Sequence, residues 1–300
     1  MHHDSCPLCN SPDISLFLTC SDHLVSGGDF GLYRCGNCSF LFTNEYPPEE
    51  DSAMYYESED YISHSDSGKT LLDRTYRAVR SYMLIRKRNL VMKTTGLRKG
   101  KILDIGSGTG HFLSVMKASG WHTEGIEISE KARKYASAYL DVDTVSPGNI
   151  SQFPDNYFDC ITLWHVLEHF YDPFGYMAEI KRLLKPDGIL ILALPNCSSS
   201  DSKHYGKYWA AFDVPRHLWH FDPFTLHSFA GKTGFRNILT KRLPFDVFYI
   251  SILSEKHKGS KFPSITGLVK GLFFAAGSIL SKECSSSLVY LLQPEKGNQN

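Results

Sequence analysis

The sequence predicts an α/β fold built on a mostly parallel, nucleotide-binding sheet. A strand-like run ends at Ile105, and Gly106, Gly108 and Gly110 follow it at alternate positions. A helical pattern then runs from His111 to Ser119. Strand, glycine turn and helix form the first unit of a nucleotide-binding βαβ fold. The 300 residues, 42% of them apolar, are sufficient for one such domain with additions.

Two C-x-x-C pairs near the N-terminus predict a structural metal site. Cys6 and Cys9 form the first pair, Cys35 and Cys38 the second, and strand-like segments lie between them. Four thiolates on two such turns bind zinc tetrahedrally, and a site closed by four protein ligands is structural. Disulfides and a redox motif are the alternatives; a cytoplasmic chain disfavours stable disulfides. We predict a zinc ribbon over residues 1–45 with Zn²⁺ as its ion.

Residues 46–95 are predicted to form an aromatic, acidic linker followed by a helix. Two interpretations of the linker remain open. It is either an irregular connector packed through its aromatic side chains, or a lid that faces the ligand through Tyr55, Tyr56, Tyr61 and His64. From Leu71 to Thr94, apolar residues recur at helical spacing, which predicts a helix against the edge of the sheet.

The glycine turn differs from the loops that bind dinucleotides. Those loops read G-x-G-x-x-G and place a pyrophosphate on a helix N-terminus. Here the spacing is G-x-G-x-G, and Asp104 precedes it at the end of the strand. A carboxylate there would repel a pyrophosphate but accept hydrogen bonds from an ammonium group. The turn therefore suits a nucleoside that carries an amino acid.

The run L-D-I-G-S-G-T-G resembles the first motif of class I S-adenosylmethionine-dependent methyltransferases of the type 11/23-like kind, and residues 101–195 follow that pattern. The resemblance implies a Rossmann-like, seven-stranded sheet with helices on both faces, and S-adenosyl-L-methionine as cofactor. Glu127, which with Ile128 follows the second strand, is expected to bind the ribose hydroxyls. The other implied contacts are Asp104, Gly106, Ser107, Gly108 and Gly110 with the methionine part, and Asn149 with Ile150 beside the adenine.

Later segments continue the alternation of strands and helices. The fourth strand is expected over Phe158–Leu163 and the fifth over Ile189–Leu194. A helix from about Pro173 to Leu184 lies between them, with Pro186 and Gly188 as its stop signals.

The stretch W-H-V-L-E-H follows the fourth strand. Ligands of open α/β sheets bind beyond the carboxyl ends of the strands, so Trp164 and His165 are expected beside the methyl donor. His165, Glu168 and His169 also spell H-x-x-E-H, an inverted zinc-peptidase signature that this position disfavours. In the ubiquinone-biosynthesis O-methyltransferases, which this region resembles, acidic residues and a histidine here hold a divalent metal. Whether these three residues bind a second metal stays open.

The loop after the fifth strand concentrates aromatic, imidazole and charged side chains. Methyl transfer to oxygen needs a base near the acceptor hydroxyl, and histidine ordinarily titrates near neutrality. His217 is the first candidate, with His220 and His165 beside it. Arg216 is a candidate for binding a carboxylate or phosphate of the acceptor. These four residues are the predicted catalytic set.

The C-terminal part, residues 197–300, is predicted to hold this cap loop, the last strands and further helices. A helix is expected over Pro223–Gly231 and a strand from Gly234 to about Leu243. The family pattern implies a last strand, Ser287–Leu292, inserted antiparallel beside it. An apolar helix over Ile265–Leu280 is interpreted either as core or dimer surface, or as a patch that contacts a membrane or a lipid-linked acceptor.

Composition limits the classes of partner. Lys and Arg number 32, as do Asp and Glu, so net charge favours neither nucleic acid nor an anionic membrane. Arg34 is the single Lys or Arg between Cys6 and Cys38, and we expect no nucleic-acid partner. The N-terminus has no signal-peptide pattern, and the most apolar run, Leu272–Leu280, is too short to span a bilayer. We expect a cytoplasmic protein without a transmembrane segment; the oligomeric state stays open.

These patterns predict a methyltransferase core over residues 96–196 that acts on a small molecule. A zinc-binding module ahead of this fold also resembles the sugar C-methyltransferases of deoxysugar biosynthesis, which act on nucleotide-linked sugars. A nucleotide-linked sugar or a cell-envelope glycan precursor is therefore the first expectation for the acceptor. O-methylation of a phenol or quinone precursor, and a non-catalytic cofactor-binding scaffold, are the alternatives.

Overall fold

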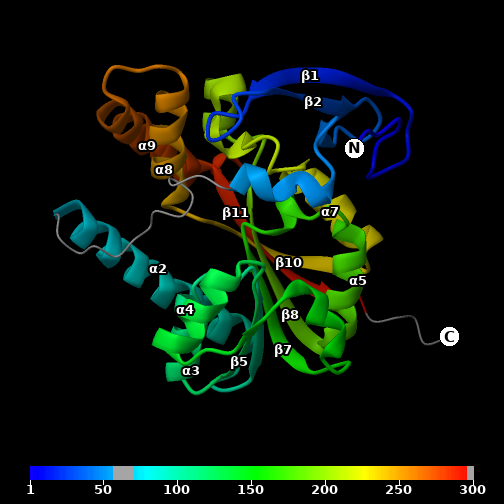
Figure 1. The fold of residues 1–300 in the computed structure, drawn as a ribbon, viewed down its shortest axis with the longest axis vertical. Helices are drawn as coiled ribbons and strands as arrows, with labels where there is room; N and C mark the ends of the chain where they lie inside the picture. The colour runs from blue at the N-terminus through cyan, green and yellow to red at the C-terminus, as the bar shows by residue number, and fades with distance from the viewer. Residues whose placement is uncertain (57–70, 296–300) are drawn as a thin grey trace.

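The computed structural model describes the backbone of residues 1–56 and 71–295, and the side chains of residues 1–56 and 77–295. Its centre is a seven-stranded sheet in the order β10-β11-β8-β7-β4-β5-β6 (Figure 1). The strands are β4 (Lys101–Ile105), β5 (His122–Ile126), β6 (Thr144–Val145), β7 (Phe158–Trp164), β8 (Leu184–Pro195), β10 (Phe235–Arg242) and β11 (Ser287–Pro294). Strands β4 to β8 pair in parallel, whereas β11 pairs antiparallel with both β8 and β10. The fold class predicted from the sequence is confirmed.

Helices cover both faces of this sheet because successive side chains of a strand point to opposite sides. On one face, Ile102 packs with residues of α2 and α3. On the other face, Leu103 packs with residues of α5 and α7. The helices are α2 (Leu71–Thr95), α3 (His111–Ala118), α4 (Glu130–Leu140), α5 (Pro173–Leu183), α6 (Ser200–Tyr205), α7 (Pro223–Lys232), α8 (Asp246–His257) and α9 (Pro263–Leu280).

Strand β8 begins earlier than predicted. It starts at Leu184, so Pro186 and Gly188 lie inside the strand instead of in a turn before it. Leu184 pairs with Phe158, and an irregularity in the register follows before Cys160 pairs with Ile189. The break in regular pairing accommodates the proline, which has no backbone N–H to donate.

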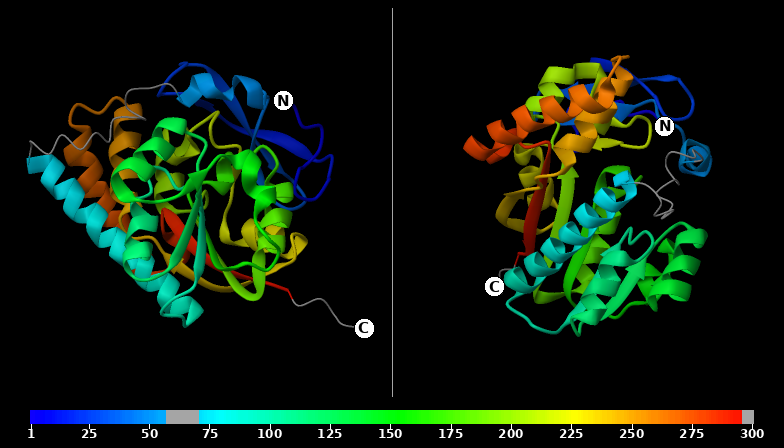
Figure 2. Two further views of the ribbon diagram at one scale, coloured as in Figure 1. Left: turned by 60° about the horizontal axis from the view of Figure 1, so that its bottom comes forward. Right: turned by 90° about the vertical axis from the view of Figure 1, so that its left-hand side faces the viewer.

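The N-terminal segment forms a second, antiparallel sheet in the order β1-β2-β3-β9. Its strands are β1 (Ile14–Ser21), β2 (Asp29–Cys35), β3 (Leu41–Asn44) and β9 (Trp219–His220). The last strand comes from the cap loop, so the ribbon and the C-terminal part share one sheet. Figure 2 shows the blue ribbon strands lying against the yellow-green cap segments.

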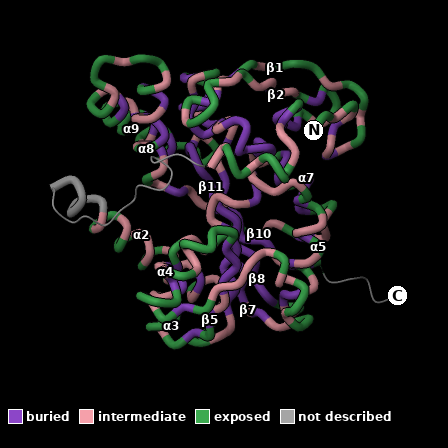
Figure 3. The backbone as a smooth tube through the Cα atoms, in the orientation of Figure 1, coloured by how far each residue is buried: buried purple, intermediate pink, exposed green. Residues whose placement is uncertain are grey.

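Helices α8 and α9 form a hairpin between β10 and β11, at one corner of the molecule (Figure 1). Helix α9 has 18 residues, so the nine-residue run considered from the sequence understated the apolar segment. Among the described residues it is the one helix long and apolar enough to cross a membrane by length and composition. The length argument made for Leu272–Leu280 does not extend to the whole of this helix, and Figure 3 shows exposed stretches along it.

Candidate active site

The glycine turn lies between β4 and α3 and has the backbone shape that only glycine adopts easily. Gly106, Gly108 and Gly110 have φ values of 72°, 54° and 80°. A Cβ atom added to Gly106 would lie 2.4 Å from Val166, whereas one added to Gly108 would meet nothing within 4 Å. The turn is therefore packed at its first glycine and open at its second, as a loop that receives a ligand must be.

The two acidic residues expected at the cofactor lie beside this turn. Glu127 accepts hydrogen bonds from the backbone N–H groups of Gly108 and Ser129, each at 2.8 Å. Asp104 is buried, and the Thr162 hydroxyl donates a 2.5 Å hydrogen bond to it. Burial raises the pKa of Asp104 to about 7, although the bond from Thr162 opposes this shift. A cation bound nearby would restore its ionised form.

Other residues predicted to bind the cofactor surround the same edge of the sheet. Ile128 is 80% exposed, an uncommon state for an isoleucine, and Asn149 and Ile150 are half-buried on the short helix Pro147–Gln152. The Ser107 hydroxyl and the Trp164 indole N–H are buried without a hydrogen-bond partner among the described residues. The open cradle and these unpaired groups fit S-adenosylmethionine. Their contacts with it remain predictions.

Lys87 on α2 joins this site, although it is not among the predicted site residues. Its ammonium lies 4.2 Å from the centre of the Trp164 ring. Burial lowers the pKa of Lys87, whereas the carboxylates of Asp104 and Asp246 oppose that shift. The spacing of residues on α2 could have identified it. Lys87 lies four residues after Met83 and four before Val91, both of which pack on the sheet, so it lies on the same face of the helix as they do.

His165 comes directly after β7 and has a left-handed backbone, with φ of 60°. Its Nε2 lies 2.8 Å from Asp246 Oδ2 on α8, and its Nδ1 lies 3.5 Å from Glu168 Oε1. Burial disfavours the charged ring, but Asp246 and Glu168 outweigh burial and raise the pKa of His165 to about 10. His165 is thus protonated at neutral pH and unsuited to the role of a base, contrary to its place in the predicted catalytic set.

Glu168, His169 and His217 form the most chemically versatile group at this edge. Their ligand atoms all lie within 4.8 Å of one another. Glu168 is 1% exposed, and neither of its carboxylate oxygens has a hydrogen-bond partner among the described residues. The group that the structure assembles contains His217 where the sequence motif had suggested His165. We call it the Glu-His-His group.

Backbone carbonyls fix the tautomers of both histidines. Nδ1 of His169 donates to the Arg216 carbonyl at 3.0 Å, and Nδ1 of His217 donates to the Ala211 carbonyl at 2.9 Å. Because a carbonyl only accepts, the Nε2 atoms are left without a proton in the neutral rings. Burial and the neighbouring His217 lower the pKa of His169 to about 4. Such rings can accept a proton or ligate a divalent metal.

Arg216 and His220 occupy positions that differ from their predicted roles. Arg216 is buried, and its guanidinium bonds Asp22, Asp213 and the carbonyl of Tyr55. His220 is buried on β9, with Nε2 at 3.0 Å from the Thr43 hydroxyl, and burial holds its pKa well below the usual value. Both side chains join the ribbon to the cap, so this geometry does not support acceptor binding by Arg216 or base catalysis by His220.

Part of the predicted lid lies over the Glu-His-His group. The hydroxyl of Tyr56, at the end of the 3-10 helix Glu49–Tyr56, lies 3.1 Å from His169 Nδ1. Tyr55 contributes its carbonyl to Arg216. Tyr61 and His64, the other two lid residues, lie outside the described part of the chain. The described segment therefore forms a wall of the site through Tyr56.

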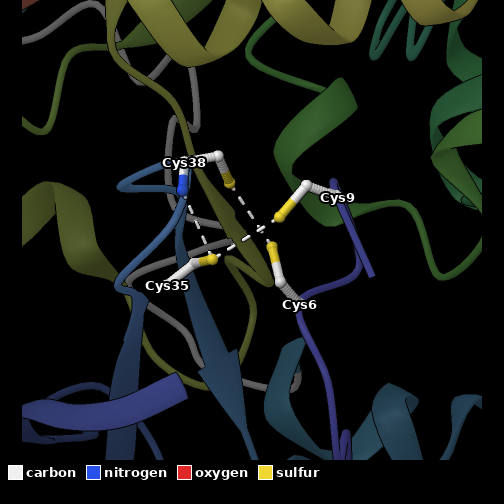
Figure 4. Close-up of side chains that lie close together, drawn as sticks. All are labelled: Cys6, Cys9, Cys35 and Cys38. Carbon is white, nitrogen blue, oxygen red and sulfur yellow. Dashed lines mark hydrogen bonds between the residues drawn. The ribbon is translucent and has the colours of Figure 1, made fainter. Parts of the chain in front are cut away.

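The four predicted metal-binding cysteines converge at one point (Figure 4). Their sulfurs lie within 4.8 Å of one another, and the pairs Cys6–Cys38 and Cys9–Cys35 are each 3.6 Å apart. Sulfurs bound at about 2.3 Å to one tetrahedral zinc lie roughly 3.8 Å apart. The Cys38 N–H and the Asn37 amide point at two of the sulfurs from 3.5 Å. The cluster is consistent with a zinc ribbon.

The fold and this site define a methyltransferase of the class I, S-adenosylmethionine-dependent kind. A protein-family model described as a methyltransferase domain matches residues 76–240, more than half of the chain. The chain belongs to this methyltransferase family.

Known proteins share parts of this chain. The ubiquinone biosynthesis O-methyltransferase of Thiobacillus denitrificans is 34% identical over 103 residues, which cover 32% of this chain and 44% of that protein. The uncharacterized methyltransferase YcgJ of Bacillus subtilis is 26% identical over 158 residues, 50% of this chain and 54% of that protein. The chain spans about half the length of the curated relatives it matches.

Solved structures share the fold at low identity. The 1,6-didemethyltoxoflavin-N1-methyltransferase of Burkholderia thailandensis superimposes with a TM-score of 0.52 at 14% identity, over 87% of this chain and 98% of that one. A SAM-dependent methyltransferase of Archaeoglobus fulgidus gives 0.50 at 20% identity, over 74% and 98%. At these identities the likeness concerns the fold alone.

Proposed function

We propose that this methyltransferase modifies a nucleotide-linked sugar or a related cell-envelope glycan precursor, with His217 as the general base. The observation that carries the base assignment is the bond from His217 Nδ1 to the Ala211 carbonyl. It fixes the tautomer that presents an unprotonated Nε2, in a group that also contains the buried carboxylate of Glu168. The bound cofactor supplies an electrophilic methyl group. His217 takes the proton that the acceptor releases.

The wall around the base supports a glycan acceptor. The cap loop that carries His217 also carries β9, which completes the sheet of the ribbon. The cysteine-bearing N-terminal module thus adjoins the loop that carries His217, and a zinc-binding module ahead of this fold resembles the enzymes acting on nucleotide-linked sugars. We propose that the cysteine cluster holds one structural Zn²⁺ and keeps this wall rigid.

A phenol or quinone precursor is the second candidate for the acceptor. It is favoured by the similarity of the core to the ubiquinone biosynthesis O-methyltransferases. His217 would serve that chemistry equally, since a phenol also releases a proton when it is methylated. The atom that is methylated, located by NMR of the product, separates the two candidates.

Cofactor binding is the first test, measured by isothermal titration calorimetry. S-adenosylmethionine should bind the wild-type protein, and Glu127→Ala should weaken binding at least tenfold because the ribose loses its carboxylate. Glu124→Ala, on the same strand, is the matched control and should bind normally. Equal affinities for all three proteins would refute the ribose assignment. Binding without turnover of any acceptor would leave a cofactor-binding scaffold.

Turnover tests the base. His217→Gln should lower kcat by about 10²–10⁴-fold with little change in cofactor affinity. His227→Gln, an exposed histidine on α7, is the control and should keep wild-type activity. If the Glu-His-His group instead holds a divalent metal, a chelator will abolish activity and added Mg²⁺ or Mn²⁺ will restore it. That result would overturn the assignment of His217 as a base.

A further inference from the structure

Helix α9 has an unusual distribution of side chains. The four residues that it buries are Gly267, Gly271, Phe274 and Ser278, three of them small. A Cβ atom added to Gly267 would lie 2.5 Å from the backbone of Ile252, so glycine is what allows α9 to approach α8 closely. The large apolar side chains face outward instead: Ile265, Leu268, Val269, Leu272, Phe273, Ile279 and Leu280 are all exposed.

This distribution is the reverse of that in a helix on a water-soluble domain, which turns its large apolar side chains to the core. The single charged residue of α9 is likewise turned inward. Lys270 points toward α8, where it pairs with Glu255 at 2.7 Å. Small residues at the helix contact and large apolar residues outside it are typical of helices that lie in lipid. Phe262, just before α9, adds a further exposed aromatic side chain.

Positive charge lies at both ends of this apolar face. Lys258 and Lys261 precede α9 and are exposed, and Lys282 follows it, also exposed. Glu283 is the one exposed acidic residue from Lys256 to Cys284. A second copy of the chain laid parallel on α9 would bring Lys258 and Lys261 against the same two lysines of that copy. An anionic bilayer complements the same pattern, since lysines beside an apolar helix reach lipid headgroups while the apolar side chains enter the acyl region.

We propose that the α8–α9 hairpin binds the surface of anionic membranes, with the outer face of α9 inserted at the level of the headgroups. The connections favour a helix that lies on the membrane over one that crosses it. The N-terminal end of α9 returns through α8, and its C-terminal end leads within a few residues into β11 of the central sheet. The hairpin also starts at Asp246, the partner of His165, so a docked membrane would lie on a segment that is joined directly to the active site.

Vesicle flotation tests the proposal with the full-length purified protein. We expect it to float with vesicles of phosphatidylcholine and phosphatidylglycerol, and less with phosphatidylcholine alone or at high salt. Replacing Leu272 and Phe273, which are 62% and 76% exposed, by serine should lower partitioning on the order of 30-fold. Lys258→Glu with Lys261→Glu should abolish the preference for phosphatidylglycerol.

Tyr139→Ser on α4 is the matched control, because Tyr139 is 74% exposed on another helix. It should float as the wild type does. The substituted side chains are exposed, so each variant should retain the circular dichroism spectrum and melting temperature of the wild type. Failure of the wild type to float, or undiminished flotation of the Leu272–Phe273 variant, would overturn the proposal. A wild-type dimer that this variant dissociates, without vesicle binding, would instead assign the face to a second copy. None of these outcomes depends on methyltransferase activity.

Discussion

Charge at single residues decides how the active edge of the sheet is organised. His165, Asp246, Lys87 and Asp104 bring two basic and two acidic groups together at the carboxyl ends of β4 and β7. Buried charges are tolerated where they pair with one another. In this arrangement His165 is held as a cation, and we propose His217 as the base instead.

The His165–Asp246 pair predicts a pH dependence of stability. The pKa of His165 is raised from 6.5 to about 10 in the folded protein, where Asp246 and Glu168 outweigh the opposing effect of burial. Its stabilising contribution is therefore complete below pH 6.5 and declines as the pH rises toward 10. His165→Gln should cost on the order of 1–2 kcal/mol near pH 6, after allowance for solvent screening, and much less near pH 10.

Denaturant unfolding of wild type and variant at both pH values measures this difference. His227→Gln is the control, since an exposed histidine should change stability equally little at either pH. A cost of His165→Gln that is the same at pH 6 and pH 10 would show that the pair is not an ion pair in solution.

At the scale of elements, local patterns in the sequence predicted most of the fold. The strand His122–Ile126 and the helix from Leu71 agree with the structure within a residue, because their apolar periodicity and boundaries are local. The cysteine cluster was equally readable, since its four ligands lie on two short turns. The apolar helix expected over Ile265–Leu280 agrees with α9. Its pairing with α8 and the direction of its large side chains were not predicted, because periodicity alone does not tell an inner face from an outer one.

Zinc content tests the cysteine cluster as a structural element. The wild type should contain one zinc per chain by atomic emission, and the double variant Cys6→Ser/Cys9→Ser should lose it. A structural site contributes directly to folding, so the variant should also melt at a lower temperature. Cys284→Ser removes a half-buried thiol elsewhere and should keep the metal. Wild-type protein without zinc would contradict the assignment.

At the scale of the whole molecule, the features that could not be predicted from the sequence depend on contacts between distant parts of the chain. Arg216 pairs with Asp22, 194 positions away, and β9 completes a sheet that begins at residue 14. Beside the histidines Arg216 was assigned to the substrate, because only its nearby partner Asp213 is visible in the local sequence, whereas Asp22 is not. The division into ribbon, linker, core and cap describes stretches of sequence, whereas the ribbon sheet draws on the first and the last of them.

The buried contact between Arg216 and Asp22 predicts that ribbon and cap unfold together. Arg216→Met should cost about 3–5 kcal/mol, because it leaves the carboxylates of Asp22 and Asp213 without their partner. Wild-type unfolding followed by far-ultraviolet circular dichroism and by tryptophan fluorescence should give one coincident transition. Arg236→Met, at a more exposed position on β10, is the control and should cost little. Two separate transitions in the wild type would show that the ribbon is an independent unit.

The two-residue strand β9 also determines the order in which parts of this protein can fold during synthesis. As the chain leaves the ribosome, all four cysteines are synthesised early, and the zinc ion that we propose for them could bind at that stage. The outer edge of β3, however, stays unpaired until the cap loop has been synthesised, because the Thr43 hydroxyl donates to the backbone carbonyl of a residue 174 positions later. For that interval the nascent chain carries an open strand edge, the kind of surface on which unfinished chains associate. Strand β9 can therefore cover the edge of β3 only after the methyltransferase core has been synthesised.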